Sequence, residues 1–308
     1  MAARSVIIDC DPGTDDALAL LLAFGSPDLD IRAITVAGGN VGLERTLGNA
    51  LSLVALAGSA APVHGGADRP LLGAYGFAPE VHGDDGLGGI ALPAGAAPAP
   101  ALAADAIRDV LRGAAQSVTL VGIGPVTNIA LALVTEPPLA EKIAEIVLMA
   151  GSWGEGNTTP SAEFNVWNDP EAFAVLLACG RPLVLAPLEL TAHALVTDAR
   201  IASLRARGDG ACLRTACNIL DSVPRSQRFG GLGFALHDPC TVAWLLRPEL
   251  FTARECPVTV DLVPGPNRGR TVIDRWNRTG LPPNATVLET LDADGFFQLL
   301  GDRLAALS

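Results

Sequence analysis

The sequence contains a single lysine, Lys142, and its other strongly basic side chains are all arginines. A phosphate-binding P-loop and a Schiff-base mechanism both require a lysine at a particular place. Lys142 lies in Glu141-Lys-Ile-Ala-Glu145, a setting that is typical of a solvated helix face. We therefore expect neither kind of chemistry from this chain.

Basic residues are also scarce as a class. The formal net charge is −12 and the isoelectric point is near 4.7. Because no basic patch is visible, neither nucleic acid nor an acidic membrane surface is an expected partner. The apolar runs, such as residues 18–24, are too short to span a membrane. An expected strand begins within a few residues of the N-terminus, which leaves no room for a signal peptide.

Paired cysteine motifs are missing as well. The chain has six cysteines but no Cys-x-x-Cys pair, and most of them have apolar neighbours. This pattern is typical of reduced core residues, not of a disulfide framework or a zinc site, and it indicates a cytoplasmic protein. The cysteines are Cys10, Cys179, Cys212, Cys217, Cys240 and Cys256.

What the sequence does contain is an alternation of short apolar strands and helices. With 308 residues and 49% hydrophobic content, the chain can bury a substantial core. Repeated strand, loop and helix imply parallel pairing with right-handed crossovers. We predict an α/β fold in a single domain over residues 1–308, with an open, mainly parallel, Rossmann-like sheet flanked by helices and a C-terminal β-hairpin. The expected strands are 6–8, 31–36, 62–64, 118–122, 146–150 and 183–186, and the hairpin joins 258–262 to 271–275.

The most informative stretch runs from Val6 to Leu20. An apolar strand leads into Asp9-Cys-Asp11, Pro and Gly break it, and Thr14 is an expected helix cap before Asp15-Asp16. One acid in a helix's first turn is ordinary, because it offsets the helix dipole. Four carboxylates at one strand end would repel one another unless a cation lies among them. Oxygen ligands without nearby His or Cys favour Ca²⁺ or Mg²⁺ over zinc.

Other polar residues follow the remaining predicted strands, where open α/β sheets bind their ligands. Together these segments resemble the nucleoside hydrolases, the ribonucleoside N-ribohydrolases, in the right order over nearly the whole chain. The segments are Asp9-Cys-Asp-Pro-Gly-Thr-Asp-Asp16, Gly39-Asn40, Gly156-Asn157, Ala162-Glu-Phe-Asn165 and His237-Asp-Pro-Cys240.

The resemblance implies a calcium-dependent hydrolase that cleaves the N-glycosidic bond of ribonucleosides and forms a homodimer or homotetramer. It implies that Asp11 is the general base acting on the calcium-bound water and that His237 protonates the departing base. Implied Ca²⁺ ligands are Asp11, Asp16, Asp238 and the backbone carbonyl of Ile123. Implied substrate contacts are Asp15, Asn40, Met149, Asn157, Glu163 and Asn165 around the ribose, and His82 beside the base.

Each residue also has a purely structural interpretation when taken alone. Asn40 after two glycines suits a turn. Glu163 and Asn165 suit loop caps, Met149 suits the core, and Asp238 before a proline suits a helix N-cap. The functional interpretation rests on their coincidence at strand ends and on the order of the motifs.

The sequence leaves the preferred base open. Some members carry tyrosines before the histidine that His237 matches, whereas the only tyrosine here is Tyr75. Trp153 and Trp167 are candidates for stacking on a base, as aromatic residues do in purine-preferring relatives, although packing is the stronger interpretation of Trp167.

Two other functions remain as alternatives. A Mg²⁺-dependent haloacid-dehalogenase-type phosphatase also has a strand ending in Asp-x-Asp. Its motif needs Thr or Val two places after the second Asp, where this chain has Gly13. A nucleoside- or ribose-binding homologue with little turnover would keep the same pocket, and the presence of Asp11, Asp16 and Asp238 argues against it.

Overall fold

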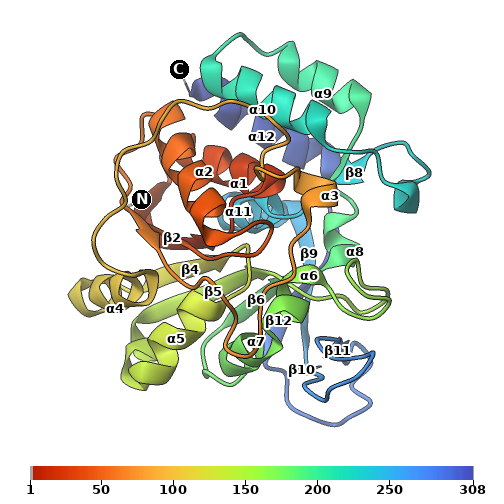
Figure 1. Cartoon of the computed structure of the whole chain (residues 1–308). Coiled ribbons are helices and arrows are strands. Elements are labelled where there is room, and N and C mark those ends of the chain that lie inside the picture. The colour runs from red at the N-terminus through yellow and green to blue at the C-terminus, as the bar shows by residue number, and fades with distance from the viewer. Residues whose placement is uncertain (1–2, 308) are drawn as a thin grey trace.

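The computed structural model describes residues 3–307 and contains one large β-sheet covered by helices on both faces (Figure 1). The strand order is β3-β2-β1-β4-β5-β6-β12-β9. All neighbouring pairs are parallel except β12 and β9. The strands are β1 (Arg4–Cys10), β2 (Leu29–Val36), β3 (Val63–Gly65), β4 (Val118–Gly122), β5 (Ile143–Met149), β6 (Leu183–Ala186), β9 (Phe251–Cys256) and β12 (Ala285–Leu291).

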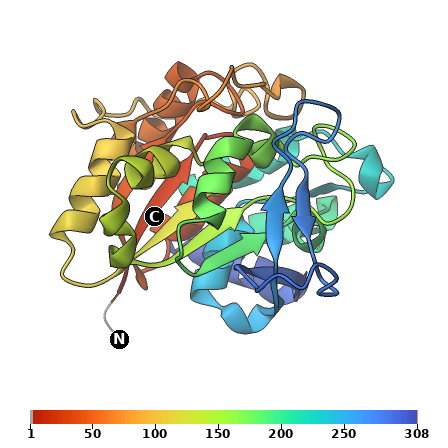
Figure 2. The same cartoon turned by 90° about the horizontal axis from the view of Figure 1, so that it is seen from below.

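The two faces of the sheet carry different helices and separate apolar cores. Figure 1 shows one group above the sheet and the other below it, and Figure 2 shows the lower group from its outer side. The upper group is α1 (Thr14–Phe24), α2 (Leu43–Leu56), α9 (Asp198–Arg205), α10 (Ala211–Ser222), α11 (Pro239–Leu246) and α12 (Ala293–Ala306). The lower group is α4 (Ala103–Gly113), α5 (Thr127–Thr135), η1 (Pro137–Lys142) and α7 (Pro170–Leu177).

Shorter elements lie in the connections. Four-to-five-residue helices are α3 (Pro79–His82), α6 (Phe164–Asn168) and α8 (Leu188–Thr191), and 3₁₀ turns are η2 (Gln227–Phe229) and η3 (Pro248–Leu250). Two small antiparallel pairs join β7 (Leu195–Val196) to β8 (Phe234–Ala235) and β10 (Val258–Val260) to β11 (Thr271–Ile273).

The fold class is confirmed as a single-domain α/β fold with a large, mostly parallel sheet, and β10 and β11 form the expected hairpin. Three details differ from expectation. Strands β9 and β12 extend the sheet beyond β6, so the C-terminal part contributes more than the hairpin. The helical region 198–228 divides into α9 and α10 and ends at Ser222. Gly13, not Thr14, is the N-cap of α1. No helix in the described part of the chain is long and apolar enough to cross a membrane.

The chain order places a crevice beside the first strand. From β1 the chain proceeds outward to β2 and β3, then returns to add β4 on the other side of β1. Connections leave in opposite directions at such a switch point, which opens a crevice beyond the carboxyl ends of the two strands. Asp11 follows β1 and Ile123 follows β4, so both lie at this crevice.

Candidate active site

The turn from β1 into α1 is built around the carboxylate of Asp16. Its Oδ1 accepts a hydrogen bond from the Asp11 amide at 3.1 Å, and its Oδ2 accepts one from the Gly13 amide at 3.0 Å. Asn40 Nδ2 donates to the same Oδ2 at 3.0 Å and to the Asp11 carbonyl at 3.0 Å. Asp16 therefore caps its own helix and links it to the loop after β2.

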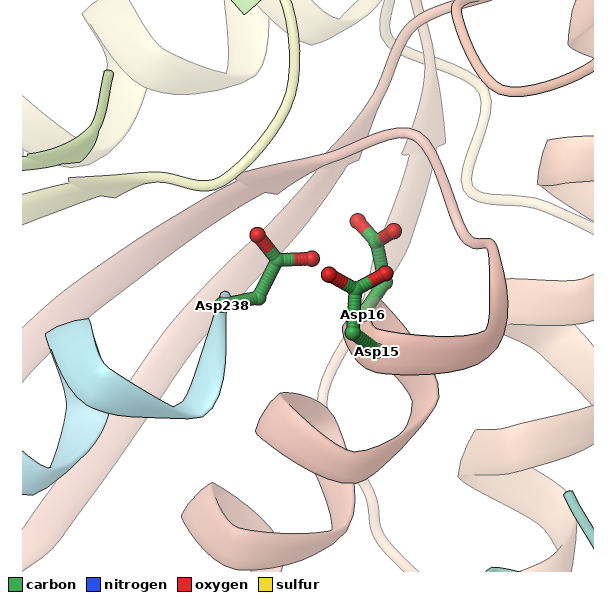
Figure 3. Close-up of side chains that lie close together, drawn as sticks. All are labelled: Asp15, Asp16 and Asp238. Carbon is green, nitrogen blue, oxygen red and sulfur yellow. The ribbon is translucent and has the colours of Figure 1, made fainter. Parts of the chain in front are cut away.

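Three carboxylates converge beside this turn. Asp15, Asp16 and Asp238 each offer an oxygen, and these oxygens lie within 4.8 Å of one another. Figure 3 shows Asp238 approaching from the start of α11 while the other two come from the first turn of α1. Asp238 occupies the N-cap position of α11, but its side chain caps no amide. Its carboxylate is thus free for the site, which argues against a capping role.

Asp11 lies at the floor of the crevice and is fully buried. Its Oδ2 accepts a hydrogen bond from the Asn40 amide at 2.7 Å, whereas its buried Oδ1 has no hydrogen-bond partner. Gly39 and Gly124 press against the two oxygens so closely that a Cβ on either glycine would overlap the carboxylate. Both glycines are needed for Asp11 to fit at the strand end.

Burial and mutual repulsion raise the pKa values of these acids. Burial is the larger cause and raises the pKa of Asp16 to about 7. The pKa values of Asp11 and Asp238 lie well above the ordinary range because of burial and the neighbouring carboxylates. A dense group of buried carboxylates with an unpartnered oxygen on Asp11 fits a hard divalent cation, which would supply the missing positive charge.

One side chain, that of Asn165, orients a backbone carbonyl at the end of β4 and another at the end of β5. Asn165 Nδ2 donates to the carbonyl of Ile123 at 3.1 Å and to that of Met149 at 3.0 Å. Ile123 and Met149 therefore contribute ordered backbone oxygens at the ends of β4 and β5. Met149 itself is buried in the upper core, as expected for an apolar strand end, and it also lines the cavity.

Glu163 holds the loop after β5 in place. Its carboxylate accepts hydrogen bonds from the amides of Gly151 at 3.0 Å, Asn165 at 2.7 Å and Val166 at 3.1 Å. Burial outweighs these bonds and raises the pKa of Glu163 to about 7. Asn157 is exposed, and its Oδ1 accepts from the Phe164 amide at 2.9 Å. Both residues thus accept hydrogen bonds from backbone amides of this loop, and both line the cavity.

Two histidines face the same cavity, and each is oriented by a threonine. The Thr14 amide donates to His82 Nδ1 at 3.1 Å, so the Nε2 atom of neutral His82 carries the proton. Thr191 Oγ1 lies 2.7 Å from His237 Nδ1. Burial is the main cause that lowers the pKa of both imidazoles below its ordinary value.

A cavity of about 470 Å³ is lined by most of these groups, although Asp11 and Asp16 are not among its lining residues. Its lining includes every predicted substrate residue and Asp238, and its rim adds Phe77, Phe229 and Trp167. Trp153 is not among its lining residues, and the Arg275 guanidinium stacks on that indole, 4.3 Å from the ring centroid. Of the two candidate stacking residues, only Trp167 is in position.

The sequence analysis did not predict the supporting roles of four residues around these groups. Gly39 and Gly124 make room for Asp11, and Thr14 and Thr191 orient the histidines. The glycines had a recognisable signal, since each follows a predicted strand. Thr191 had none, because its partner His237 is 46 positions away and the two meet only through the tertiary fold.

Comparison with known proteins decides the family. A sequence model of the inosine-uridine preferring nucleoside hydrolases matches residues 6–298. The chain belongs to this family. It is 44% identical over 307 residues to the pyrimidine-specific ribonucleoside hydrolase RihA of Escherichia coli strain ATCC 8739, a match that covers 98% of each sequence. It is a ribonucleoside hydrolase, so the phosphatase alternative was wrong.

Solved nucleoside hydrolases share the fold. The purine-preferring ribonucleoside hydrolase from Gardnerella vaginalis superposes with a TM-score of 0.91 at 29% identity and covers 99% of each chain. A plant nucleoside hydrolase gives a TM-score of 0.91 at 31% identity, over 98% of this chain and 99% of that one. Nucleoside hydrolases are metal-dependent, and here the acidic cluster of Asp15, Asp16 and Asp238 is the candidate metal centre.

Proposed function

We propose that this nucleoside hydrolase uses Ca²⁺ and the carboxylate of Asp11 to hydrolyse the N-glycosidic bond of ribonucleosides, releasing ribose and free base. The observation that carries the proposal is the unpartnered, buried Oδ1 of Asp11 beside three converging carboxylates. An acceptor without a donor in a buried position is costly and indicates a missing ligand. A cation and a water are the ligands that these oxygens suit.

The chain's residues would divide the reaction between the two ends of the cavity. Breaking the bond between C1′ and the base nitrogen leaves positive charge on the sugar, which the carboxylates of Asp15 and Glu163 would stabilise. Asp11 would take the proton of the attacking water, whose oxygen bonds to C1′. The electron pair leaves with the base, which His237 would protonate.

Asp11, Asp16, Asp238 and the carbonyl of Ile123 would hold the metal ion. When bound, such an ion would polarise a water and help to orient the ribose. The oxygen-only ligand set supports calcium or magnesium, and we expect calcium. The ribose contacts would be Asp15, Asn40, Met149, Asn157, Glu163 and Asn165, with His82 beside the base.

We expect a preference for pyrimidine nucleosides. RihA, which is 44% identical over nearly the full length, is pyrimidine-specific, whereas the purine-preferring relative from Gardnerella vaginalis is 29% identical. The cavity is compatible with this, because Trp167 lines it and Trp153 does not, so the two indoles do not form a sandwich for a purine. We also expect a cytoplasmic homodimer or homotetramer, which light scattering after gel filtration would test.

The first experiment is a reducing-sugar assay with uridine, cytidine, inosine and adenosine, with and without a calcium chelator. Because a general base contributes about 100- to 10,000-fold in rate, Asp11→Asn should lower kcat by at least about 100-fold. Asp294→Ala, at an exposed carboxylate on α12, is the control and should leave kcat unchanged. Bound calcium without ribose release from any nucleoside would indicate a binding homologue instead.

A further inference from the structure

Arg228 places a cation at the mouth of the cavity. It lies in η2, in the segment that joins α10 to β8 and extends away from the body of the molecule (Figure 1). Its side chain lines the same cavity as His82 and His237. Its Nη1 donates one long hydrogen bond, 3.3 Å, to the carbonyl of Gly156 in the loop after β5. The guanidinium thus bridges two loops above the site.

The other arginine in the cavity wall is fully engaged elsewhere. Arg225 forms an ion pair with Asp198 at 2.6 Å, donates to the carbonyls of Leu220 and Val223, and stacks on the ring of Phe234. Arg228, by contrast, makes no ion pair with any residue in the described part of the chain. Most of its five N–H donors therefore remain available to a ligand.

The groups around the cavity differ in charge. Asp15, Asp16 and Asp238 lie together at the end where the ribose would bind. His82 and His237 line the same cavity, but an imidazole carries no permanent charge. Arg228 keeps its charge at any working pH. Among the described residues that line the cavity, Arg228 is the permanent cation that forms no ion pair, whereas Arg225 pairs with Asp198.

The proposed reaction creates a need for such a cation. When the bond between C1′ and the base nitrogen breaks, the electron pair moves onto the base. In uracil, cytosine and hypoxanthine that charge is shared with an exocyclic carbonyl oxygen, whereas adenine has no carbonyl. A hydrogen bond from a guanidinium to a carbonyl oxygen becomes stronger as negative charge grows on that oxygen.

We propose that Arg228 binds the exocyclic carbonyl oxygen of the base and stabilises its negative charge as it leaves, which makes this enzyme selective for nucleosides of oxo bases. The proposal rests on the proposed function of the cavity. Arg228 stands in the segment before His237, which contains no tyrosine in this chain.

The test measures kcat and KM of Arg228→Gln on uridine, inosine, adenosine and p-nitrophenyl riboside. Nitrophenolate is a stable anion that leaves without assistance. Losing one transition-state donor typically costs about 100-fold in kcat, so uridine and inosine should lose about that much while adenosine and the nitrophenyl riboside change by less than about 3-fold. Arg228→Lys keeps the charge and should recover part of the lost rate.

Two further variants separate this role from loop support. Arg225→Gln loosens the same segment through its ion pair with Asp198, and it should affect all four substrates alike. Arg303→Gln, at an exposed ion pair with Asp28, should affect none. An equal loss on uridine and the nitrophenyl riboside in Arg228→Gln, or unchanged selectivity, overturns the proposal for Arg228. No ribose release by the wild type from any natural nucleoside would instead overturn the proposed function.

Discussion

Asp11 illustrates how much of this site is decided by what surrounds a single side chain. Its Oδ2 is fixed by the Asn40 amide, and its buried Oδ1 has no hydrogen-bond partner. Backbone from two neighbouring loops approaches both oxygens, which is possible only because Gly39 and Gly124 lack a Cβ. The loops are thus part of the mechanism even though they contribute no functional group.

Gly124→Ala tests this at the residue scale. The new methyl group would overlap Asp11 Oδ1, and relieving the overlap requires the carboxylate to turn or the loop to move. A 1 Å displacement of a reacting group can cost about 100-fold in rate, so kcat for uridine should fall by about that factor. The free energy of unfolding, from urea titration, should fall by only about 1–3 kcal/mol.

The matched control is Gly48→Ala on the exposed side of α2. A Cβ there meets nothing within 4 Å, so alanine should raise the free energy of unfolding by up to about 1 kcal/mol and leave kcat unchanged. Wild-type kcat in Gly124→Ala would show that the position of Asp11 Oδ1 is unimportant for turnover.

At the scale of elements, the connection from β3 to α3 is held by buried polar groups. Asp169 Oδ2 accepts from the Leu71 amide at 2.9 Å and from Thr127 Oγ1 at 2.6 Å, and Tyr75 Oη lies 2.8 Å from that hydroxyl. This clamp fixes the loop that carries His82 into the cavity. The lone tyrosine is therefore structural and contacts no substrate site.

Asp169→Asn should weaken this clamp, because it changes the hydrogen-bonding groups of the side chain while keeping the size of the side chain. If the NH₂ group of the asparagine replaced Oδ2, it would face the Leu71 N–H and the Thr127 hydroxyl, which are both donors in the wild type. If the amide were flipped, the NH₂ group would replace Oδ1, and the cap on the Ala172 amide of α7 would be lost. Leaving buried polar groups unpaired costs about 1–3 kcal/mol, so the free energy of unfolding should fall by that amount. Limited proteolysis should then cleave near residues 66–82 first.

The control for that variant is Asp28→Asn, which removes an exposed ion pair with Arg303 and should cost less than about 1 kcal/mol. If Asp169→Asn unfolded with wild-type stability and resisted the protease equally, the clamp would have no role in ordering this loop.

The sequence predicted the elements that are regular over short distances. The buried strands and the acidic turn at Asp11 and Asp16 were recognisable because apolar runs, breakers and acids follow one another directly. Strand β9 was not, since four of its six residues are exposed and it pairs only at the sheet edge. The pairs of Thr191 with His237 and of Asp169 with Leu71 depend on tertiary packing, which leaves no local pattern.

At the scale of the whole molecule, the buried acids link stability to pH. Burial raises the pKa values of Asp9, Asp16 and Glu163 to about 7 from ordinary values near 4. Between these values the folded protein holds protons that the unfolded chain releases. In the metal-free enzyme, the contribution of these groups to the free energy of unfolding is therefore fully present below about pH 4. It is lost as the pH rises from about 4 through 7.

Calcium should reverse this loss, because it replaces the protons as the counter-charge of Asp16. The measurement is Tm in chelator and in calcium at pH 5 and pH 8. Calcium at 100 times its Kd adds about 2.7 kcal/mol to the free energy of unfolding, and proton competition weakens its binding at pH 5. The calcium-induced rise in Tm should therefore be larger at pH 8.

Two variants assign the effect to the acidic cluster. Asp16→Asn removes both a proton-binding group and a metal ligand, so the rise in Tm with calcium should shrink sharply at pH 8. Asp302→Asn removes an exposed carboxylate that pairs with Arg207 and should respond to calcium like the wild type. Because the molecule carries a net charge of −12, nonspecific calcium binding would instead stabilise both variants equally, and that result would contradict a specific site.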